Sequence, residues 1–303
     1  MSNGDDLAFD LEPATVARAF DRASGRYEAA AALQAKVRAE LLVRLDELKP
    51  PRDARVVLDL GAGTGAATAA LRDRFRKARV VAVDLAPGML REAARHQRLF
   101  RRFDRVLADA AQLPFADASV DVAYSNLMLQ WFVDPARVFF ELARVLRPGG
   151  LLVFSSFGPE TLRELRAAWE TADPGGVHVN RFIDVHDLGG ALQRTGFAEP
   201  VLDVDRLRLH HADATGLLRE LKAIGAHNVN AGRARALTGR RRFEAMVGAY
   251  ETLRTPKGLP ATWEIVYGIA WAAETPRDEG LAMRAETRID AGTLLNRLRR
   301  RRT

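Results

Sequence analysis

The stretch Val56-Val57-Leu58-Asp59-Leu60-Gly61-Ala62-Gly63-Thr64-Gly65 decides the fold of this 303-residue chain. Its first five residues form a short β-rich apolar run, and its glycines precede a helical pattern that begins at Ala66. Glycine lets the backbone turn sharply and approach a ligand without a Cβ in the way. A glycine loop between a strand and a helix therefore predicts a crevice in which backbone N–H groups and the positive helix end face a ligand.

The segments around this loop alternate between strand and helix patterns, which predicts a parallel sheet covered by helices on both faces. Toward the C-terminus the pattern changes to helices, a strand, a helical insertion and a last strand. The further expected strands are residues 79–84, 104–108, 120–125, 151–156, 201–211 and 263–272. The expected helices are 12–49 with a break at 21–25, 66–75, 87–97, 135–146, 160–171, 184–195 and 213–254, and a turn is expected at 147–150.

These patterns divide the chain into three parts. We expect an N-terminal helical cover over residues 1–49, an α/β domain over 50–275 with a helical insertion at about 213–254, and a disordered basic tail over 276–303. The net charge is +7, and five tail arginines supply five of these charges, which leaves +2 for the rest (7 − 5). The body is nearly balanced, so nucleic acid is not the expected partner. The five are Arg297, Arg299, Arg300, Arg301 and Arg302.

The chain contains no cysteine, which excludes a thiolate zinc site, an iron–sulfur cluster and a cysteine nucleophile. We expect no metal. The acidic segment 1–10 does not resemble a signal peptide, and no stretch approaches about 18 uninterrupted apolar residues. We therefore expect a cytoplasmic protein without a membrane span.

Two cofactor hypotheses are compatible with the glycine loop. Gly61, Gly63 and Ala66 satisfy the pattern G-x-G-x-x-A of dinucleotide-binding enzymes. Asp84 follows about 20 residues later, where an acid binds ribose. Asp59 separates the two hypotheses, because a carboxylate at the crevice would repel a pyrophosphate. A ligand that carries an ammonium and a sulfonium group suits that acid better.

Three later motifs, at residues 108–115, 125–131 and 144–150, accompany the glycine loop in this order. Together they resemble the class I S-adenosylmethionine-dependent methyltransferases, over about residues 55–157. The resemblance implies a Rossmann-like α/β fold with a mostly parallel seven-stranded sheet and helices on both faces. It also implies S-adenosyl-L-methionine as the cofactor. Because methyl transfer from a sulfonium to a carboxylate is favoured in a closed, water-poor site, we expect the N-terminal and inserted helical pieces to form a lid.

The same resemblance implies roles for individual residues. Asp84 would bind the ribose hydroxyls, Asp109 would accept from the adenine amino group, and Ala110 would donate to the ring. Tyr27 and Gln34 lie on the N-terminal cover, where they could cover the sulfonium. The residues expected around the cofactor are Gln34, Asp59, Gly61, Gly63, Gly65, Asp84, Asp109, Ala110, Asn126 and Gln130, with Asn126 and Gln130 on the methyl-transfer side.

The methyl acceptor is constrained by the residues after the fourth strand. Methyltransferases that act on nucleic-acid amines resemble one another in an Asn/Asp-Pro-Pro-aromatic run, which grips a flipped base. This chain has Ser125-Asn126-Leu127-Met128 there, with no proline and no aromatic residue. Base methylation is therefore disfavoured, and cytosine-C5 chemistry is excluded by the lack of cysteine.

The flanking segments carry a second resemblance, from about Val16 to Trp271. They are residues 20–27, 33–34, 129–131, 157–165, 178–182, 221–228, 237–240 and 260–267. Together they look like the malonyl-acyl-carrier-protein O-methyltransferases of biotin synthesis. This resemblance implies methyl-esterification of the free malonyl carboxylate on acyl-carrier protein, an acidic partner. We expect the enzyme to be a monomer.

Such a reaction makes modest demands on side chains. A carboxylate is already ionised at pH 7, so no general base is needed, and catalysis is mainly positioning in a water-poor site. An arginine could orient the carboxylate by paired hydrogen bonds, and we nominate Arg181 and, less firmly, Arg22. Tyr27, Arg181 and His178 form the expected catalytic set, with His178 as a substrate ligand. The basic runs 240–242 and 101–102 are candidates for docking the acidic carrier.

Two alternatives stay open. The first resembles the mitochondrial complex I assembly factors, which share the cofactor fold but modify a protein arginine. That branch tends to have His where Gln130 stands. The second is a cofactor-binding scaffold without chemistry, against which the intact set Asp59, Gly61, Asp84 and Asp109 argues.

Overall fold

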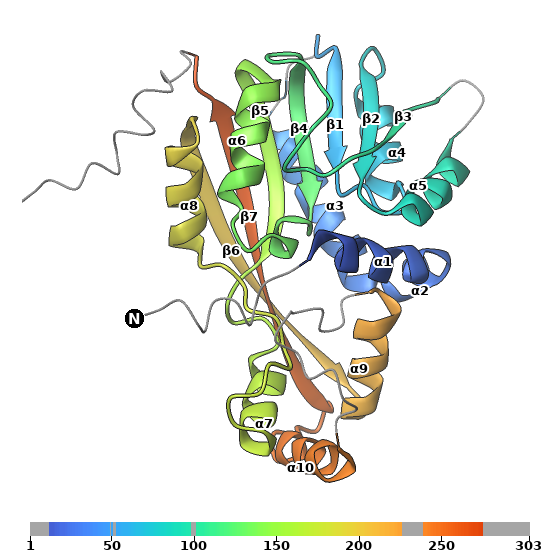
Figure 1. The fold of residues 1–303 in the computed structure, drawn as a ribbon, viewed down its shortest axis with the longest axis vertical. Helices are drawn as coiled ribbons and strands as arrows, with labels where there is room; N and C mark the ends of the chain where they lie inside the picture. Colours follow the sequence, from blue (N-terminus) through green and yellow to red (C-terminus); the bar gives the residue numbers. More distant parts are fainter. Residues whose placement is uncertain (1–11, 49, 51–52, 98–100, 226–238, 275–303) are drawn as a thin grey trace, which may run out of the picture.

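The computed structural model describes residues 12–48, 50, 53–97, 101–225 and 239–274 (Figure 1). Residues 1–11 of the expected cover and the whole expected tail, 276–303, lie outside this part. Within it, no helix is long and apolar enough to cross a membrane.

A seven-stranded sheet in the order β3-β2-β1-β4-β5-β7-β6 forms the centre of the molecule. Strands β1 to β5 are parallel, whereas β7 pairs antiparallel with both β5 and β6. The predicted fold class is confirmed: a mostly parallel α/β sheet of Rossmann type. The strands are β1 (Val56–Leu60), β2 (Arg79–Asp84), β3 (Asp104–Leu107), β4 (Val120–Asn126), β5 (Leu146–Phe157), β6 (Phe197–His211) and β7 (Leu259–Ala272).

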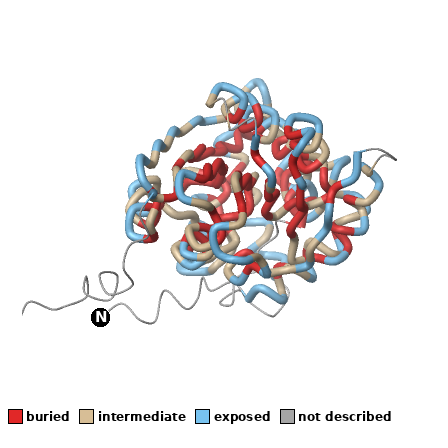
Figure 2. Tube along the Cα trace, turned by 90° about the horizontal axis from the view of Figure 1, so that it is seen from above, coloured by how far each residue is buried: buried red, intermediate tan, exposed pale blue. Residues whose placement is uncertain are grey.

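Helices cover both faces of this sheet because successive strand residues point to opposite sides. In β1, Val57 belongs to the core cluster with α3, α4 and α5, whereas the next residue, Leu58, belongs to the cluster with α6 and α8 on the other face. The buried segments gather in the middle of the molecule (Figure 2). The helices are α1 (Pro13–Ala23), η2 (Ser24–Arg26), α2 (Tyr27–Ala30), α3 (Ala32–Glu47), α4 (Ala66–Arg74), α5 (Pro87–Ala93), η3 (Ala94–His96), η4 (Leu129–Trp131), α6 (Ala136–Val145), α7 (Arg163–Ala172), α8 (Val185–Arg194), α9 (Ala214–Ala223) and α10 (Arg240–Glu251).

Several helices begin where the sequence supplies a start signal. Pro13 opens α1, where its missing N–H costs nothing. Asp184 caps α8 by accepting a hydrogen bond from the N–H of His186 at 2.8 Å. Asp213 caps α9 in the same way through the N–H of Gly216 at 2.7 Å.

The expected turn at 147–150 is part of β5 instead. Val120 pairs with Leu146 and Val122 already pairs with Leu151, so β5 holds extra residues opposite a short piece of β4. Gly149 has a φ of +72°, which lets the strand bulge at this point. The Pro-Gly-Gly signal therefore correctly predicted an irregular backbone, but the prediction that the strand begins only after it, at residue 151, was wrong.

Strands β6 and β7 run past the carboxyl ends of the parallel strands. The last residue of β5, Phe157, pairs with Ile265, and the β7 residues before Ile265 pair only with β6. Helices α7, α9 and α10 gather around this overhang in Figure 1. The predicted helical insertion corresponds to α9 and α10, and residues 226–238 between them lie outside the described part.

Candidate active site

The glycine loop between β1 and α4 is packed against three neighbouring elements. Gly61 has a φ of +64°, and a Cβ there would lie 2.5 Å from Met128 Cγ. Gly65 has a φ of +85°, and a Cβ there would lie 2.7 Å from the Cβ of Ala93 on α5. The Ala62 N–H donates to the Val83 carbonyl of β2 at 3.0 Å. Positions 61 and 65 therefore need glycine because a Cβ has no space there and because the backbone has a positive φ.

Asp84 ends β2 and binds the loop directly. One carboxylate oxygen accepts from the Gly63 N–H and the other from the Ala86 N–H, both at 2.8 Å. Burial raises the pKa of Asp84, while these backbone hydrogen bonds lower it. A carboxylate has about four acceptor sites, so Asp84 keeps capacity for a hydroxyl donor in the pocket that it lines.

Asp59 lies beneath the loop rather than in the crevice. Its side chain belongs to a residue that is 1% exposed, and it accepts a hydrogen bond from Thr68 Oγ1 at 2.5 Å. Burial raises the pKa of Asp59 to about 7, and the nearby Asp84 carboxylate adds to the rise. Asp59 is therefore not one of the residues that line the pocket described next.

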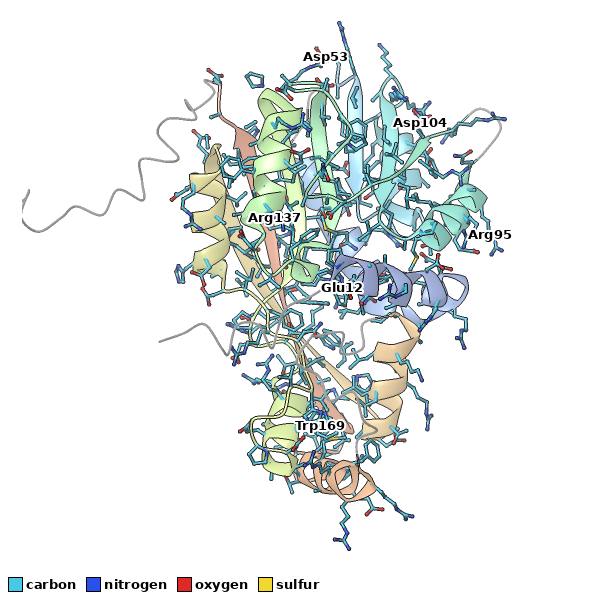
Figure 3. The ribbon with its side chains drawn as sticks, viewed as in Figure 1. Glu12, Asp53, Arg95, Asp104, Arg137 and Trp169 are labelled. Carbon is cyan, nitrogen blue, oxygen red and sulfur yellow. The ribbon has the colours of Figure 1, made fainter. Side chains whose placement is uncertain are left out.

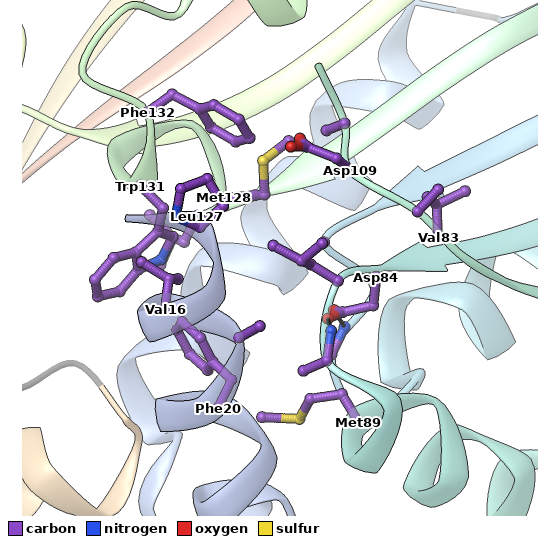
Figure 4. Close-up of a pocket in the computed structure, with 18 of the residues that line it drawn as sticks. Val16, Phe20, Val83, Asp84, Met89, Asp109, Leu127, Met128, Trp131 and Phe132 are labelled. Carbon is purple, nitrogen blue, oxygen red and sulfur yellow. Dashed lines mark hydrogen bonds between the residues drawn. The ribbon is translucent and has the colours of Figure 1, made fainter. Parts of the chain in front are cut away.

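A pocket of about 790 Å³, part of it open to solvent, lies above the loop (Figure 4). It lies at the carboxyl ends of β1, β2 and β4, and residues of α1 line one side of it. It is lined by Pro13, Val16, Ala17, Phe20, Tyr27, Gly61, Gly63, Val83, Asp84, Leu85, Ala86, Met89, Ala108, Asp109, Ala110, Asn126, Leu127, Met128, Trp131 and Phe132.

Asp109 and Ala110 form one wall of the pocket. Asp109 Oδ1 accepts from the Ala111 N–H at 2.9 Å, and the Asp109 carbonyl accepts from the Gln112 N–H at 2.9 Å. This short turn after β3 fixes the direction of the Asp109 carboxylate. Its second oxygen has no such backbone partner.

Asn126 forms the opposite wall at the end of β4. Its Oδ1 accepts from Ser155 Oγ at 3.0 Å, and its Nδ2 donates to the Gln34 carbonyl of α3 at 3.4 Å. The next residue, Leu127, has a φ of +52°, an uncommon conformation for a residue with a side chain. Such strain is frequent where a fold presents a site.

Besides Asp59, three predicted cofactor residues do not line the pocket: Gln34, Gly65 and Gln130. Gln34 is 8% exposed and takes part through its backbone carbonyl. Gln130 is turned inward, where Nε2 donates to the Leu127 carbonyl at 2.6 Å and Oε1 is buried without a hydrogen-bond partner. Gln130 thus supports the strained Leu127 turn. Gly65 also lies behind the lining surface.

An aromatic wall closes the pocket on the side of α1. The rings of Phe20 and Trp131 meet edge to face at 5.1 Å, and Tyr27 lies 6.4 Å from Phe20. Burial raises the pKa of Tyr27, so its hydroxyl stays protonated. The sequence analysis singled out Tyr27 but did not place the α1 residues in the pocket. The helical spacing of Val16 and Phe20 was the signal for an inward face.

Two acceptors hold the helical cover in place. Asp21 Oδ1 accepts from the Gly88 N–H at the start of α5, at 2.5 Å. Glu28 accepts from the Thr64 hydroxyl in the glycine loop. The cover is therefore bonded to both the cofactor loop and the helix that follows β2.

His178 does not line the pocket but lies against Trp169 of α7, which is labelled in Figure 3. Its Nε2 is 2.8 Å from Asp173 Oδ2, and its ring stacks on Trp169 at 3.9 Å. These contacts fix the segment that leads to Arg181 and Phe182.

Arg181 lies near the carboxyl end of β5. The ring of its neighbour Phe182 packs on Phe157 at 5.6 Å, and Arg181 is exposed. Burial and the positive charge of Arg181 both lower the pKa of Arg166 on α7. Arg166 donates to the carbonyls of Pro159 and Thr161 at 2.9 Å. Neither Arg181 nor Arg22, which is exposed on α1, lines the pocket.

The hydrogen-bonding groups that line the pocket fit an adenosyl group with an amino acid end. Asp84 and Asp109 offer carboxylate oxygens at two adjacent strand ends, and the glycine loop offers backbone where a Cβ is absent. Asp59, whose pKa is about 7, would in its ionised form complement a ligand that carries positive charge.

Comparisons with known proteins agree with this site. Residues 58–154 match the family described as "Methyltransferase domain". The chain is 50% identical over 271 residues to "Malonyl-[acyl-carrier protein] O-methyltransferase" of Methylovorus sp. (strain MP688), covering 87% of this chain and 90% of that protein. It is 43% identical over 261 residues to "Biotin biosynthesis bifunctional protein BioHC" of Cellvibrio japonicus (strain Ueda107), covering 86% of this chain and 50% of that protein.

The fold also matches solved structures at low sequence identity. The YcgJ protein of Bacillus subtilis superposes with a TM-score of 0.55 at 17% identity, covering 78% of this chain and 98% of that chain. That likeness concerns the fold alone. The long relatives at high identity decide the family: the chain belongs to the malonyl-[acyl-carrier protein] O-methyltransferases.

Proposed function

We propose that this chain transfers the methyl group of S-adenosyl-L-methionine to the free carboxylate of malonyl-acyl-carrier protein, an early step of biotin synthesis. The observation that carries the proposal is the 50% identity to a named malonyl-[acyl-carrier protein] O-methyltransferase over 87% of the chain. The relative named for biotin biosynthesis supports the pathway. Family membership favours this function over the protein-arginine alternative and over a scaffold without chemistry.

The pocket residues suit the cofactor in specific ways. Asp84 would bind the ribose hydroxyls, and Asp109 with Ala110 would bind the adenine, because all three line the pocket on adjacent loops. Gly61 and Gly63 would lie against the methionine part, with the charge of Asp59 behind them. When bound, the cofactor supplies a methyl group on a positively charged sulfur.

The chain itself contributes position and exclusion of water. An ionised carboxylate needs no base, so the protein has to hold it in line and keep solvent out. Phe20, Tyr27 and Trp131 form the apolar wall that does the second task. We assign the first task to Arg181, whose guanidinium could bind a carboxylate by two parallel hydrogen bonds.

Three residues enter this scheme as supports. His178, held by Asp173 and Trp169, orients the segment that carries Arg181. Gln34 and Gln130 position Asn126 and Leu127 on the methyl-transfer side. The cytoplasmic location and the monomeric state stay predictions from the sequence.

One assay tests the function. Purified protein and S-adenosyl-L-methionine are incubated with malonyl-acyl-carrier protein, and the carrier is weighed by intact-protein mass spectrometry. We expect a gain equal to one methyl ester, which mild ester hydrolysis removes. The matched control is acetyl-acyl-carrier protein, which lacks the free carboxylate and should gain nothing. Equal gain on both carriers, or none on either while the protein binds the cofactor, would contradict the proposal.

A further inference from the structure

Helix α9 lies directly beside the N-terminal cover. A Cβ at Gly225, just after α9, would lie 3.3 Å from Phe20 Cδ1 and 3.4 Å from the Ala19 carbonyl oxygen of α1. Figure 1 shows α9 next to α1 and α2. Two helical pieces that are far apart in the sequence therefore form one surface at the side of the pocket that α1 lines.

Four basic side chains lie on this surface, and we call them the cationic patch. Arg22 lies in the last turn of α1, Arg26 in η2, and Arg219 and Lys222 one turn apart on α9. All four residues are exposed. Within the described residues, none of their charged groups forms an ion pair or a hydrogen bond.

The acids on the same elements are already engaged. Asp21 accepts from the Gly88 N–H, and Glu28 accepts from the Thr64 hydroxyl. Glu220 lies 3.5 Å from His211 Nδ1. Among the described residues, none of these carboxylates forms an ion pair with a side chain of the patch, so its four charged groups stay open to a partner.

Three of the five arginines in the basic runs nominated from the sequence differ from the patch in this respect. Arg101 pairs with Asp73, Arg240 with Glu244 at 2.7 Å, and Arg242 with Asp173 at 3.4 Å. A paired surface arginine attracts an acidic partner less than an unpaired one. Those runs are also not joined to the pocket wall, whereas Arg22 shares α1 with the lining residues Val16 and Phe20.

We propose that the cationic patch of Arg22, Arg26, Arg219 and Lys222 is the docking surface for the acidic carrier protein that presents the acyl group. This inference rests on the proposed function, because it concerns the partner of that same site. A carrier protein bound there would bring the acyl group that it presents to the α1 side of the pocket. Charge complementarity of this kind speeds encounter and fixes orientation.

Charge reversal with a matched control tests the patch. The test variant is R219E/K222E on α9, and the control is R240E/R241E on α10. Both lie between β6 and β7, and both change the net charge by the same amount. We measure KM and kcat for malonyl-acyl-carrier protein at several salt concentrations, and cofactor affinity by calorimetry.

The patch variant should raise KM for the carrier about tenfold at low salt, with kcat at saturation and cofactor affinity unchanged. The control should change KM little, and R26E should add to the effect of the α9 pair. Salt should weaken the wild-type reaction more than that of the patch variant.

Other outcomes have distinct meanings. Equal effects of the two pairs would overturn the patch in favour of net charge, and an unchanged KM would overturn it outright. A wild-type protein that does not methylate the malonyl carrier would instead refute the proposed function. A fall in kcat with constant KM would contradict docking, because it would place the α9 residues at the chemistry.

Discussion

The two ends of the sheet are held together by different kinds of contact. The cofactor half, β1 to β4 with α4 and α5, is fixed by loops between neighbouring elements, such as the Gly63 N–H on Asp84. The acceptor half, the β6–β7 overhang with α7, α9 and α10, depends on contacts between distant segments. Glu164 of α7 accepts from the Thr262 N–H of β7 at 2.9 Å. We therefore expect the cofactor half to bind the cofactor through loops between neighbouring elements, and the acceptor half to select the acceptor.

Substitution of Gly61 should break the cofactor half most severely. In Gly61→Ala the new Cβ meets Met128, and the backbone keeps a φ of +64°. We expect a destabilisation of roughly 4 kcal/mol from strain and overpacking together, with loss of cofactor binding. Thermal unfolding and calorimetry measure both.

The control for that variant is the same change in the other half. Gly248 lies within α10, and nothing would touch a Cβ there within 4 Å. Gly248→Ala should stabilise the protein slightly, because alanine favours a helix. Comparable losses in the two variants would show that the loop has no special packing requirement.

The pH dependence of stability sharpens the account of Asp59. Its pKa is about 7 in the fold and 3.8 as a free side chain, so the native state binds the proton more tightly. The cofactor-free protein should therefore lose stability as pH rises from about 4 through 7. Asp59→Asn removes this loss and should be more stable than the parent at pH 8, by on the order of 3 kcal/mol.

Urea unfolding at a series of pH values checks this prediction. The two proteins should converge well below pH 3.8, the pKa of the free side chain, where the carboxyl is protonated in both states. Cofactor affinity should fall in Asp59→Asn because the buried charge is gone. Parallel stability curves for the two proteins would contradict the burial of a titrating carboxylate.

Asp84 should matter for the ligand more than for the fold. Asp84→Ala removes the acceptor of two loop N–H groups and the proposed ribose contact. We expect cofactor binding to weaken by about 2 kcal/mol. Calorimetry decides, and an unchanged affinity would remove Asp84 from the ribose site.

Arg181 provides the complementary test in the acceptor half. Arg181→Ala should lower kcat/KM for the malonyl carrier about tenfold and leave cofactor affinity unchanged. Arg181→Lys should recover only part, because lysine lacks the two-pronged donor. Equal losses in turnover and in cofactor affinity would exclude the carboxylate role.

The cofactor half was predictable from the sequence because its signals are local. The apolar run before Gly61, the acid at the end of β2 and the alternation of strands and helices each act within a few residues. The position of Asp59 was not predictable in the same way. The sequence pattern predicted that its carboxylate faces the crevice, but in the structure the carboxylate is buried and accepts a hydrogen bond from Thr68 of α4.

The acceptor half was predicted less completely because its contacts are long-range. The sequence predicted strands at 201–211 and 263–272, but β6 begins four residues earlier, at Phe197, and β7 four residues earlier, at Leu259. Helix α7 starts at Arg163, later than expected, because Leu162 has a φ of +55° and its N–H donates to the Thr262 carbonyl of β7. Such a contact exists only after the last strand is in place.

The order of the strands has a consequence for how the chain is made. Strand β7 is the last of the described strands to leave the ribosome, yet it inserts between β5 and β6. Until then, the hydrogen-bonding groups of β5 form an open edge, the kind of template that recruits other chains. During synthesis the cofactor loop is therefore complete while the sheet still lacks β7. At this stage Ser155 of β5 cannot yet pair with Tyr267 of β7. We expect this late, non-local step to set the folding rate and to be the point at which a chaperone helps most.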